Sequence, residues 1–158
     1  MPLLLSALTA APGLPGAGGR SYPGDAADAA DEWSEAISAY VAAVVPPALP
    51  AKLALAQENL RATLAAAWSS PTHDPIAGAG QLEQALHLFA LDLCAGMAPA
   101  YVALPPPGLV GFAALFVTRP FPTTRAQGIT RFANAIDAWF RTGTATLAAP
   151  PYTALTWT

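Results

Sequence analysis

The sequence predicts an all-α protein, a helical bundle of about five helices with proline-rich connectors and extended N- and C-terminal arms. Alanine, the residue with the highest helix propensity, is the commonest residue of the chain. Apolar residues recur at spacings of three and four in several segments, which is the spacing of one face of a helix. The 17 prolines lie mainly between these segments, where they end one helix before the next begins.

The same pattern divides the chain into three parts. Residues 1–24 are predicted to be an N-terminal arm, with a short helix followed by a linker rich in glycine and proline. Residues 25–143 are predicted to form the helical bundle domain. Residues 144–158 are predicted to be an extended C-terminal tail, because consecutive prolines at 150 and 151 exclude a helix there.

The first two helices of the bundle are separated by a pair of prolines. A helix is predicted from Asp25 to Val45, and Pro46 and Pro47 end it. Its apolar stripe consists of Trp33, Ile37, Tyr40, Val41 and Val44. The next helix is predicted over residues 48–68. Its apolar face consists of Leu53, Ala56, Leu60, Leu64 and Trp68.

The middle of the chain is predicted to be a loop followed by a buried helix. The loop covers residues 69–80, where serines, prolines and two glycines occur close together. The third helix covers residues 81–98 and is apolar nearly all round, which is typical of a helix covered on most sides. The next apolar run, residues 108–117, has a length that suits either a short buried helix or a strand. Its alanine pair favours the helix.

The last helix has the clearest boundary signals. Thr124 and Gln127 have the spacing of a capping box. Asp137 and Arg141 are one helical turn apart on the polar side, and Gly143 is placed to end the helix. The apolar stripe consists of Ile129, Phe132, Ala133, Ile136, Trp139 and Phe140.

Apolar side chains in the two arms are the predicted contacts with partners. They are Leu3, Leu4, Leu5, Tyr152, Leu155 and Trp157. Chain termini are disordered unless something holds them, so a tryptophan close to the end of the tail indicates a contact. The tail is predicted to lie either on its own bundle or on a neighbour, by adding a strand to a sheet edge or by filling pockets. No Lys or Arg precedes the apolar start of the N-terminal arm, so a secretory signal is not predicted.

Charged residues are scarce throughout the chain. They make up 11% of it, whereas a typical soluble domain has roughly 25%. A lone soluble protein normally carries a mixed charged surface, so we expect other chains to cover much of this one. No segment is long and apolar enough to suggest a membrane span. Acidic residues predominate before residue 93 and arginines after it. The acidic part of one copy is therefore able to attract the basic part of another. A solvated acidic helix with scattered arginines is the simpler alternative.

The sequence contains no pattern that indicates catalysis, a metal site or a cofactor. The single cysteine, Cys94, excludes an internal disulfide and lies about 10 Å from His87 along one helix, beyond hydrogen-bond reach. Paired cysteines, calcium loops and phosphate-binding glycine motifs do not occur. Four scattered C-terminal arginines do not predict nucleic-acid binding. An enzyme would need an unrecognised site around His73, Asp74 or Asp92.

Two stretches of the chain carry a resemblance to a class of known proteins. One runs from Gly96-Met97-Ala98-Pro99-Ala100 through Pro105-Pro106-Pro107 to Gly111-Phe112-Ala113-Ala114-Leu115-Phe116, and the other from Ile136 to Thr146. With the alanine-rich helices and the late tryptophan of the tail, they resemble small Ala- and Pro-rich structural (virion) proteins of tailed bacteriophages. The resemblance implies a place in the head, neck, tail or baseplate of a virion assembled in the host cytoplasm. It implies other virion proteins or copies of the same chain as partners, and it carries over no catalytic or binding residues to this sequence.

We therefore expect a non-enzymatic, multi-copy structural subunit that contacts its neighbours through apolar arms. Two alternatives belong to other functional classes. One is a monomeric helical module that binds an apolar ligand between the aromatic side chains of Trp33, Tyr40, Trp68, Phe132 and Trp139. The other is a helical effector directed at a host.

Overall fold

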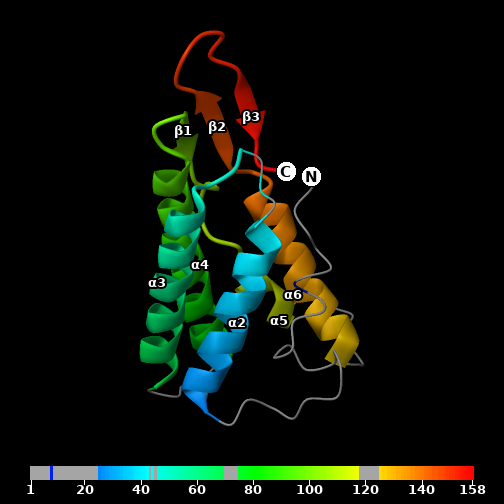
Figure 1. The fold of residues 1–158 in the computed structure, drawn as a ribbon. Helices are drawn as coiled ribbons and strands as arrows, with labels where there is room; N and C mark the ends of the chain where they lie inside the picture. The colour runs from blue at the N-terminus through cyan, green and yellow to red at the C-terminus, as the bar shows by residue number, and fades with distance from the viewer. Residues whose placement is uncertain (1–7, 9–24, 43, 45, 70–74, 118–124) are drawn as a thin grey trace.

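The computed structural model describes residues 8, 25–42, 44, 46–69, 75–117 and 125–158. These residues form five helices and a small antiparallel sheet of three strands (Figure 1). The helices are α2 (Ala26–Val41), α3 (Pro50–Trp68), α4 (Pro75–Met97), α5 (Ala113–Val117) and α6 (Arg125–Phe140). The strands are β1 (Tyr101–Leu104), β2 (Thr144–Leu147) and β3 (Ala154–Thr156). The fold is thus mostly helical, as predicted, and the sheet corrects the stricter all-α prediction.

Local chemistry explains where the first two helices begin. The Oδ1 atom of Asp25 accepts hydrogen bonds from the backbone N–H groups of Ala27 (2.8 Å) and Asp28 (2.9 Å), which caps α2. α3 begins at Pro50, where a proline is tolerated because the first turn of a helix needs no N–H donor. α2 ends at Val41, earlier than predicted.

α4 begins at Pro75, so residues 75–80 of the predicted loop are helical and the prediction was wrong there. Gly80 lies inside this helix, where glycine costs roughly 1 kcal/mol relative to alanine. Burial of Ala79 and Leu82 in the core offsets that cost. Tertiary packing, rather than the local glycines, therefore decides where α4 begins.

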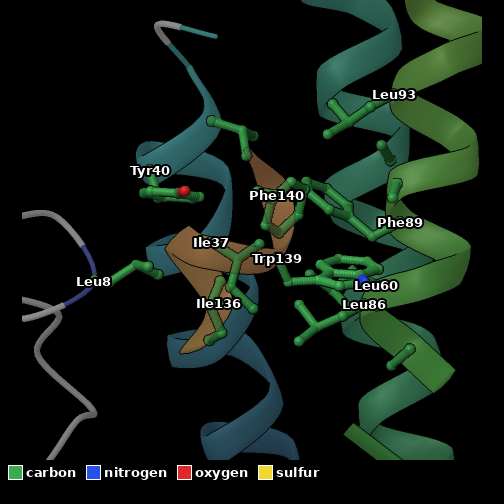
Figure 2. Close-up of a cluster of buried hydrophobic side chains, with 14 of the residues drawn as sticks. Leu8, Ile37, Tyr40, Leu60, Leu86, Phe89, Leu93, Ile136, Trp139 and Phe140 are labelled. Carbon is green, nitrogen blue, oxygen red and sulfur yellow. The ribbon is translucent and has the colours of Figure 1, made fainter. Parts of the chain in front are cut away.

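The helices surround one continuous apolar core. α2, α3 and α4 lie side by side with alternating direction, and α6 packs alongside (Figure 1). The Phe140 ring of α6 lies 5.6 Å from the Tyr40 ring of α2 and 6.4 Å from the Phe89 ring of α4, measured between centroids. Figure 2 shows these rings among the aliphatic side chains of the core, with Leu8 also pointing into it. Burial of this apolar surface is the main stabilising contribution to the fold.

The sheet lies at the end of the bundle where α4 and α6 finish (Figure 1). β1 follows α4 closely and β2 follows α6, so the sheet connects two helices that are distant in sequence. β2 is the central strand, with Ala103 opposite Ala145 on one side and Ala145 opposite Leu155 on the other. Residues 144–158, predicted as an extended tail, thus supply two of the three strands.

Candidate interaction surface

Trp157, predicted as a partner contact, is buried in its own chain. Its exposed fraction is 0%, and its ring is stacked on Phe140 with centroids 6.1 Å apart. Its backbone N–H donates to the Gly143 carbonyl (2.9 Å), which continues the ladder between β2 and β3. Of the two locations predicted for the tail, the structure places this tryptophan on its own bundle. Its side chain is therefore not available to a neighbour in this conformation.

The other predicted contact residues have different environments. Leu155 is half-buried on β3 opposite Ala145. Tyr152 is 61% exposed in the turn between β2 and β3, with a left-handed backbone (φ 53°) that is uncommon for a bulky residue. Leu3, Leu4 and Leu5 lie outside the described residues. Tyr152 is therefore the one described member of the predicted set whose side chain faces mainly solvent.

The outer edge of β1 presents unpaired backbone groups. Strands alternate between residues that exchange hydrogen bonds with the partner strand and residues that do not. The Ala148 N–H donates to the Ala100 carbonyl (2.9 Å), so the backbone of Ala100 faces β2. Every second residue along β1 does the same, so the backbone groups of Val102 and Leu104 bond to β2. The backbone groups of Tyr101 and Ala103 then point away from β2. In the described part of the chain, no further strand pairs with that edge.

The outer face of β1 is also apolar. Val102 is 64% exposed and Leu104 is 62% exposed, and both lie opposite threonines of β2. The alternating exposure along Tyr101–Leu104 is the signature of a strand with one covered face. The sequence did not predict this strand, because the strand is only four residues long and directly precedes three prolines.

A second apolar surface lies on α4. Leu88 is 51% exposed and Leu91 is 43% exposed, on the side of the helix that faces away from the core. Gln84 and Ala95 lie on the same side, and none of these four residues is charged, while the part-exposed Asp92, one turn after Leu88, borders the stripe. The sequence predicted that α4 would be covered on most sides because it is apolar nearly all round. The structure leaves the stripe Gln84, Leu88, Leu91 and Ala95 open.

Polar interactions hold the loop between β1 and α5 against the helices. The buried Glu83 carboxylate of α4 accepts a hydrogen bond from the backbone N–H of Phe112. The indole N–H of Trp139 donates to the carbonyl of Gly108 (3.3 Å). A carboxylate that bonds to a backbone N–H just before a short helix acts as a local cap. Both contacts are therefore structural.

The described histidine and cysteine do not form a reactive pair. The His87 ring lies 6.5 Å from the Trp139 ring, and its Nδ1 atom is buried without a hydrogen-bond partner in the described part of the chain. Burial raises the pKa of the half-buried Cys94 thiol to about 11, so the thiol stays protonated near neutral pH. The Asp92 carboxylate accepts a hydrogen bond from Asn59 (2.9 Å). His73 and Asp74 lie outside the described residues.

The described ranges contain no group of three or more His, Cys, Asp and Glu side chains able to hold a metal ion. None of the helices within them combines the length and the apolar character that crossing a bilayer requires. The aromatic side chains proposed to surround an apolar ligand instead belong to the core or pack against it.

Comparison of the chain with protein-family models, curated protein sequences and solved structures finds no match.

Proposed function

We propose that this chain is a non-enzymatic structural subunit of a large assembly. Its contacts with neighbouring chains are formed by the open stripe of α4 and by the outer edge and face of β1. Exposed leucine and valine side chains on these two elements are the observation that carries the proposal. Burying such side chains stabilises association, whereas leaving them in water favours aggregation.

The two surfaces suit different kinds of contact. A helix face with leucines one turn apart packs against another helix or an apolar groove. A free strand edge accepts a strand from another chain through main-chain hydrogen bonds. A subunit with both is able to contact two neighbours at once, as a repeating assembly requires.

A virion of a tailed bacteriophage is the assembly that we propose. Support for this more specific step comes from the resemblance in residues 96–116 and 136–146 and from the low charge of the chain. The neighbours would be copies of this chain or other virion proteins. The arm residues Leu3, Leu4 and Leu5 remain proposed contacts, whereas Tyr152 replaces Trp157 as the contact proposed for the tail.

Light scattering tests the proposal through the mass of the protein in solution. We expect the full chain to form oligomers whose mass rises with concentration. The double variants L88Q/L91Q and V102Q/L104Q are expected to have lower masses at the same concentration, because each removes two exposed apolar side chains. Ala62→Gln, at an exposed position of α3, is the matched control and is expected to leave the mass unchanged. Circular dichroism confirms that each variant is folded.

A folded full chain that stays monomeric at all concentrations, with an ordered C-terminus, would argue against the structural role. Oligomers whose mass is the same in both double variants and in the control would exclude the two proposed surfaces.

A further inference from the structure

A furrow lies along the seam between α2 and α3, which run antiparallel side by side (Figure 1). It consists of two hollows, of about 280 and 440 Å³, that share Glu35 and Gln57 in their walls. The larger hollow is lined mainly by apolar side chains: Ala39 of α2, Ala42 just after that helix, and Leu53 and Ala54 of α3. Small residues on both helices leave this part of the seam open at the surface.

The smaller hollow already holds a basic side chain of the chain itself. The Arg61 guanidinium lines it and forms an ion pair with Asp31 (3.4 Å between Nη1 and Oδ1). Arg61 also pairs with Glu58, and the hydrogen bond to this carboxylate is the main reason why the pKa of Arg61 is raised. At this end of the furrow, a carboxylate of α2 is therefore paired with a guanidinium of α3.

One helical turn further along α2, the corresponding carboxylate has no such partner. Glu35 is exposed at the junction of the two hollows, and across the seam it faces Gln57 instead of an arginine. In the part of the chain that the structure describes, no cation pairs with Glu35.

A second polar group in the furrow also lacks a partner. Ser38 lines the larger hollow and is only 7% exposed, and its Oγ atom has no hydrogen-bond partner among the described residues. Buried hydroxyls are normally hydrogen-bonded, so this group requires an explanation. Ser38 lines the larger hollow, so a polar group bound in the furrow lies next to this residue.

We propose that this furrow binds an arginine or lysine side chain of a neighbouring protein chain. The proposal deepens the proposed function and rests on it, since it names the chemistry of a contact within the assembly. The cationic head binds the Glu35 carboxylate and donates a hydrogen bond to Ser38, as Arg61 does to Asp31. The hydrocarbon stem lies on the alanines and Leu53, because long basic side chains bury their methylene groups on apolar surface.

The size and polarity of the furrow fit this occupant. A purely apolar guest would leave the Glu35 carboxylate and the Ser38 hydroxyl without partners. A small inorganic cation would leave the apolar walls in water. An amphipathic cation satisfies both parts, because its head pairs with the carboxylate while its stem covers the apolar walls.

Binding of a capped arginine tests the furrow directly. We would titrate the full-length protein with Nα-acetyl-arginine methylamide and follow backbone amide shifts by NMR. The neutral isostere Nα-acetyl-citrulline methylamide is the matched ligand control. We expect shifts confined to α2 and α3 around residues 35, 38 and 57, and affinity for the citrulline compound about three- to tenfold weaker, since it cannot form an ion pair.

Protein variants provide the second arm. Glu35→Gln is expected to weaken binding of the arginine compound by about three- to tenfold, and Ser38→Ala by a smaller factor. Asp28→Asn removes a carboxylate from the same helix outside the furrow and is expected to leave the affinity unchanged. Equal affinity for arginine and citrulline, or equal affinity of E35Q and wild type, would overturn the proposal. So would tight binding of spermidine with no binding of capped arginine, because that points to a free polyamine.

The outcomes for the furrow and for the proposed function are separable. If the L88Q/L91Q variant loses its oligomeric mass while arginine binding fails, the structural role stands and the furrow does not. If capped arginine binds through Glu35 while the full chain remains a monomer with an ordered C-terminus, the furrow is a cation site and the structural role fails.

Discussion

At the scale of single residues, the Trp157 ring packs directly against the backbone of Gly143. A Cβ atom added at Gly143 would lie 2.5 Å from Cδ2 of the Trp157 ring, closer than two non-bonded carbon atoms can approach. The Gly143 N–H donates to the Phe140 carbonyl (3.0 Å), and its carbonyl accepts from Trp157. The sequence predicted a glycine that ends a helix. The structure shows that the stronger requirement for glycine comes from the indole ring packed on its backbone.

Replacing this glycine is therefore expected to destabilise the protein. In Gly143→Ala, the methyl group displaces the Trp157 ring, and we expect a loss of about 1–3 kcal/mol in the free energy of unfolding, the usual cost of overpacking. Gly80→Ala is the matched control, because no atom lies within 4 Å of the added methyl. In a helix this change is expected to stabilise by about 0.5–1 kcal/mol. Urea unfolding followed by circular dichroism measures both, and equal midpoints for the two variants would contradict the packing argument.

At the scale of elements, a polar contact connects α2 to α6 at the edge of the core. The Tyr40 hydroxyl donates to Oδ1 of Asp137 (2.9 Å), and Arg141 donates to Oδ2 of the same carboxylate (2.8 Å). The sequence predicted the Asp137–Arg141 pair from its spacing, and the structure confirms it. Burial, followed by the hydrogen bond to Asp137 and the charge of that carboxylate, raises the pKa of Tyr40. The phenol is therefore held in its neutral form.

This shift predicts a loss of stability at alkaline pH. In the unfolded chain the phenol ionises near pH 10, while in the folded protein it stays protonated to higher pH. Its contribution to stability is thus fully present below pH 10 and declines above it, by up to about 1.4 kcal/mol per pH unit. At pH 7 we expect the wild type to be more stable than Tyr40→Phe by about 1 kcal/mol, through the hydrogen bond to Asp137.

The check is the urea unfolding midpoint of both proteins between pH 7 and pH 11.5. We expect the advantage of the wild type over Y40F to disappear above pH 10 and then to reverse. Tyr152→Phe removes an exposed phenol and controls for the change in composition. A difference in stability between wild type and Y40F that stays constant across the range would show that the buried phenol does not contribute to the pH dependence of stability.

At the scale of the whole molecule, residues 144–158 are part of the folded domain. β1 pairs with β2, and β2 pairs with β3, so the segment after α4 is held in place by residues at the end of the chain. Trp157 fills a position between the sheet and α6 and lies against Phe140. The last 15 residues therefore do not behave as a detachable arm.

Truncation after Gly143 is expected to destabilise the protein strongly. It removes two strands and the Trp157 side chain, and loss of a buried tryptophan alone costs about 3–5 kcal/mol. Small domains have only about 5–15 kcal/mol of total stability, so we expect the truncated chain to be largely unfolded or to melt far below the full chain. Thermal unfolding by circular dichroism measures this, with Tyr152→Ser in the full chain as the control.

An unchanged melting temperature in the truncated chain would show that the sheet is dispensable. With the expected result, a change of mass on truncation does not identify an intersubunit arm, because it follows from unfolding as well. The point variants on α4 and β1 are for that reason the sharper test of assembly.

The helices were predictable from the sequence where one face is apolar, as in α3, whose Ala56, Leu60 and Leu64 are all buried. The exposed stripe of α4 was not predictable, because a helix that is apolar all round does not reveal which side is left open. The same holds for β1, since a four-residue strand is recognised only together with its partner strand. Glu35 and Ser38 became a candidate site only when α3 was placed beside α2.

The sequence by itself determined the helical character of this protein, the positions of the main breaks and the scarcity of charge. These properties depend on propensity, on the spacing of apolar residues and on proline, which act over a few neighbouring residues. Only the tertiary structure decided that the tail folds back, that Trp157 lies on Gly143 and that apolar side chains of α4 and β1 remain in contact with solvent. These features depend on which distant segments meet, and a local pattern carries no information about that choice.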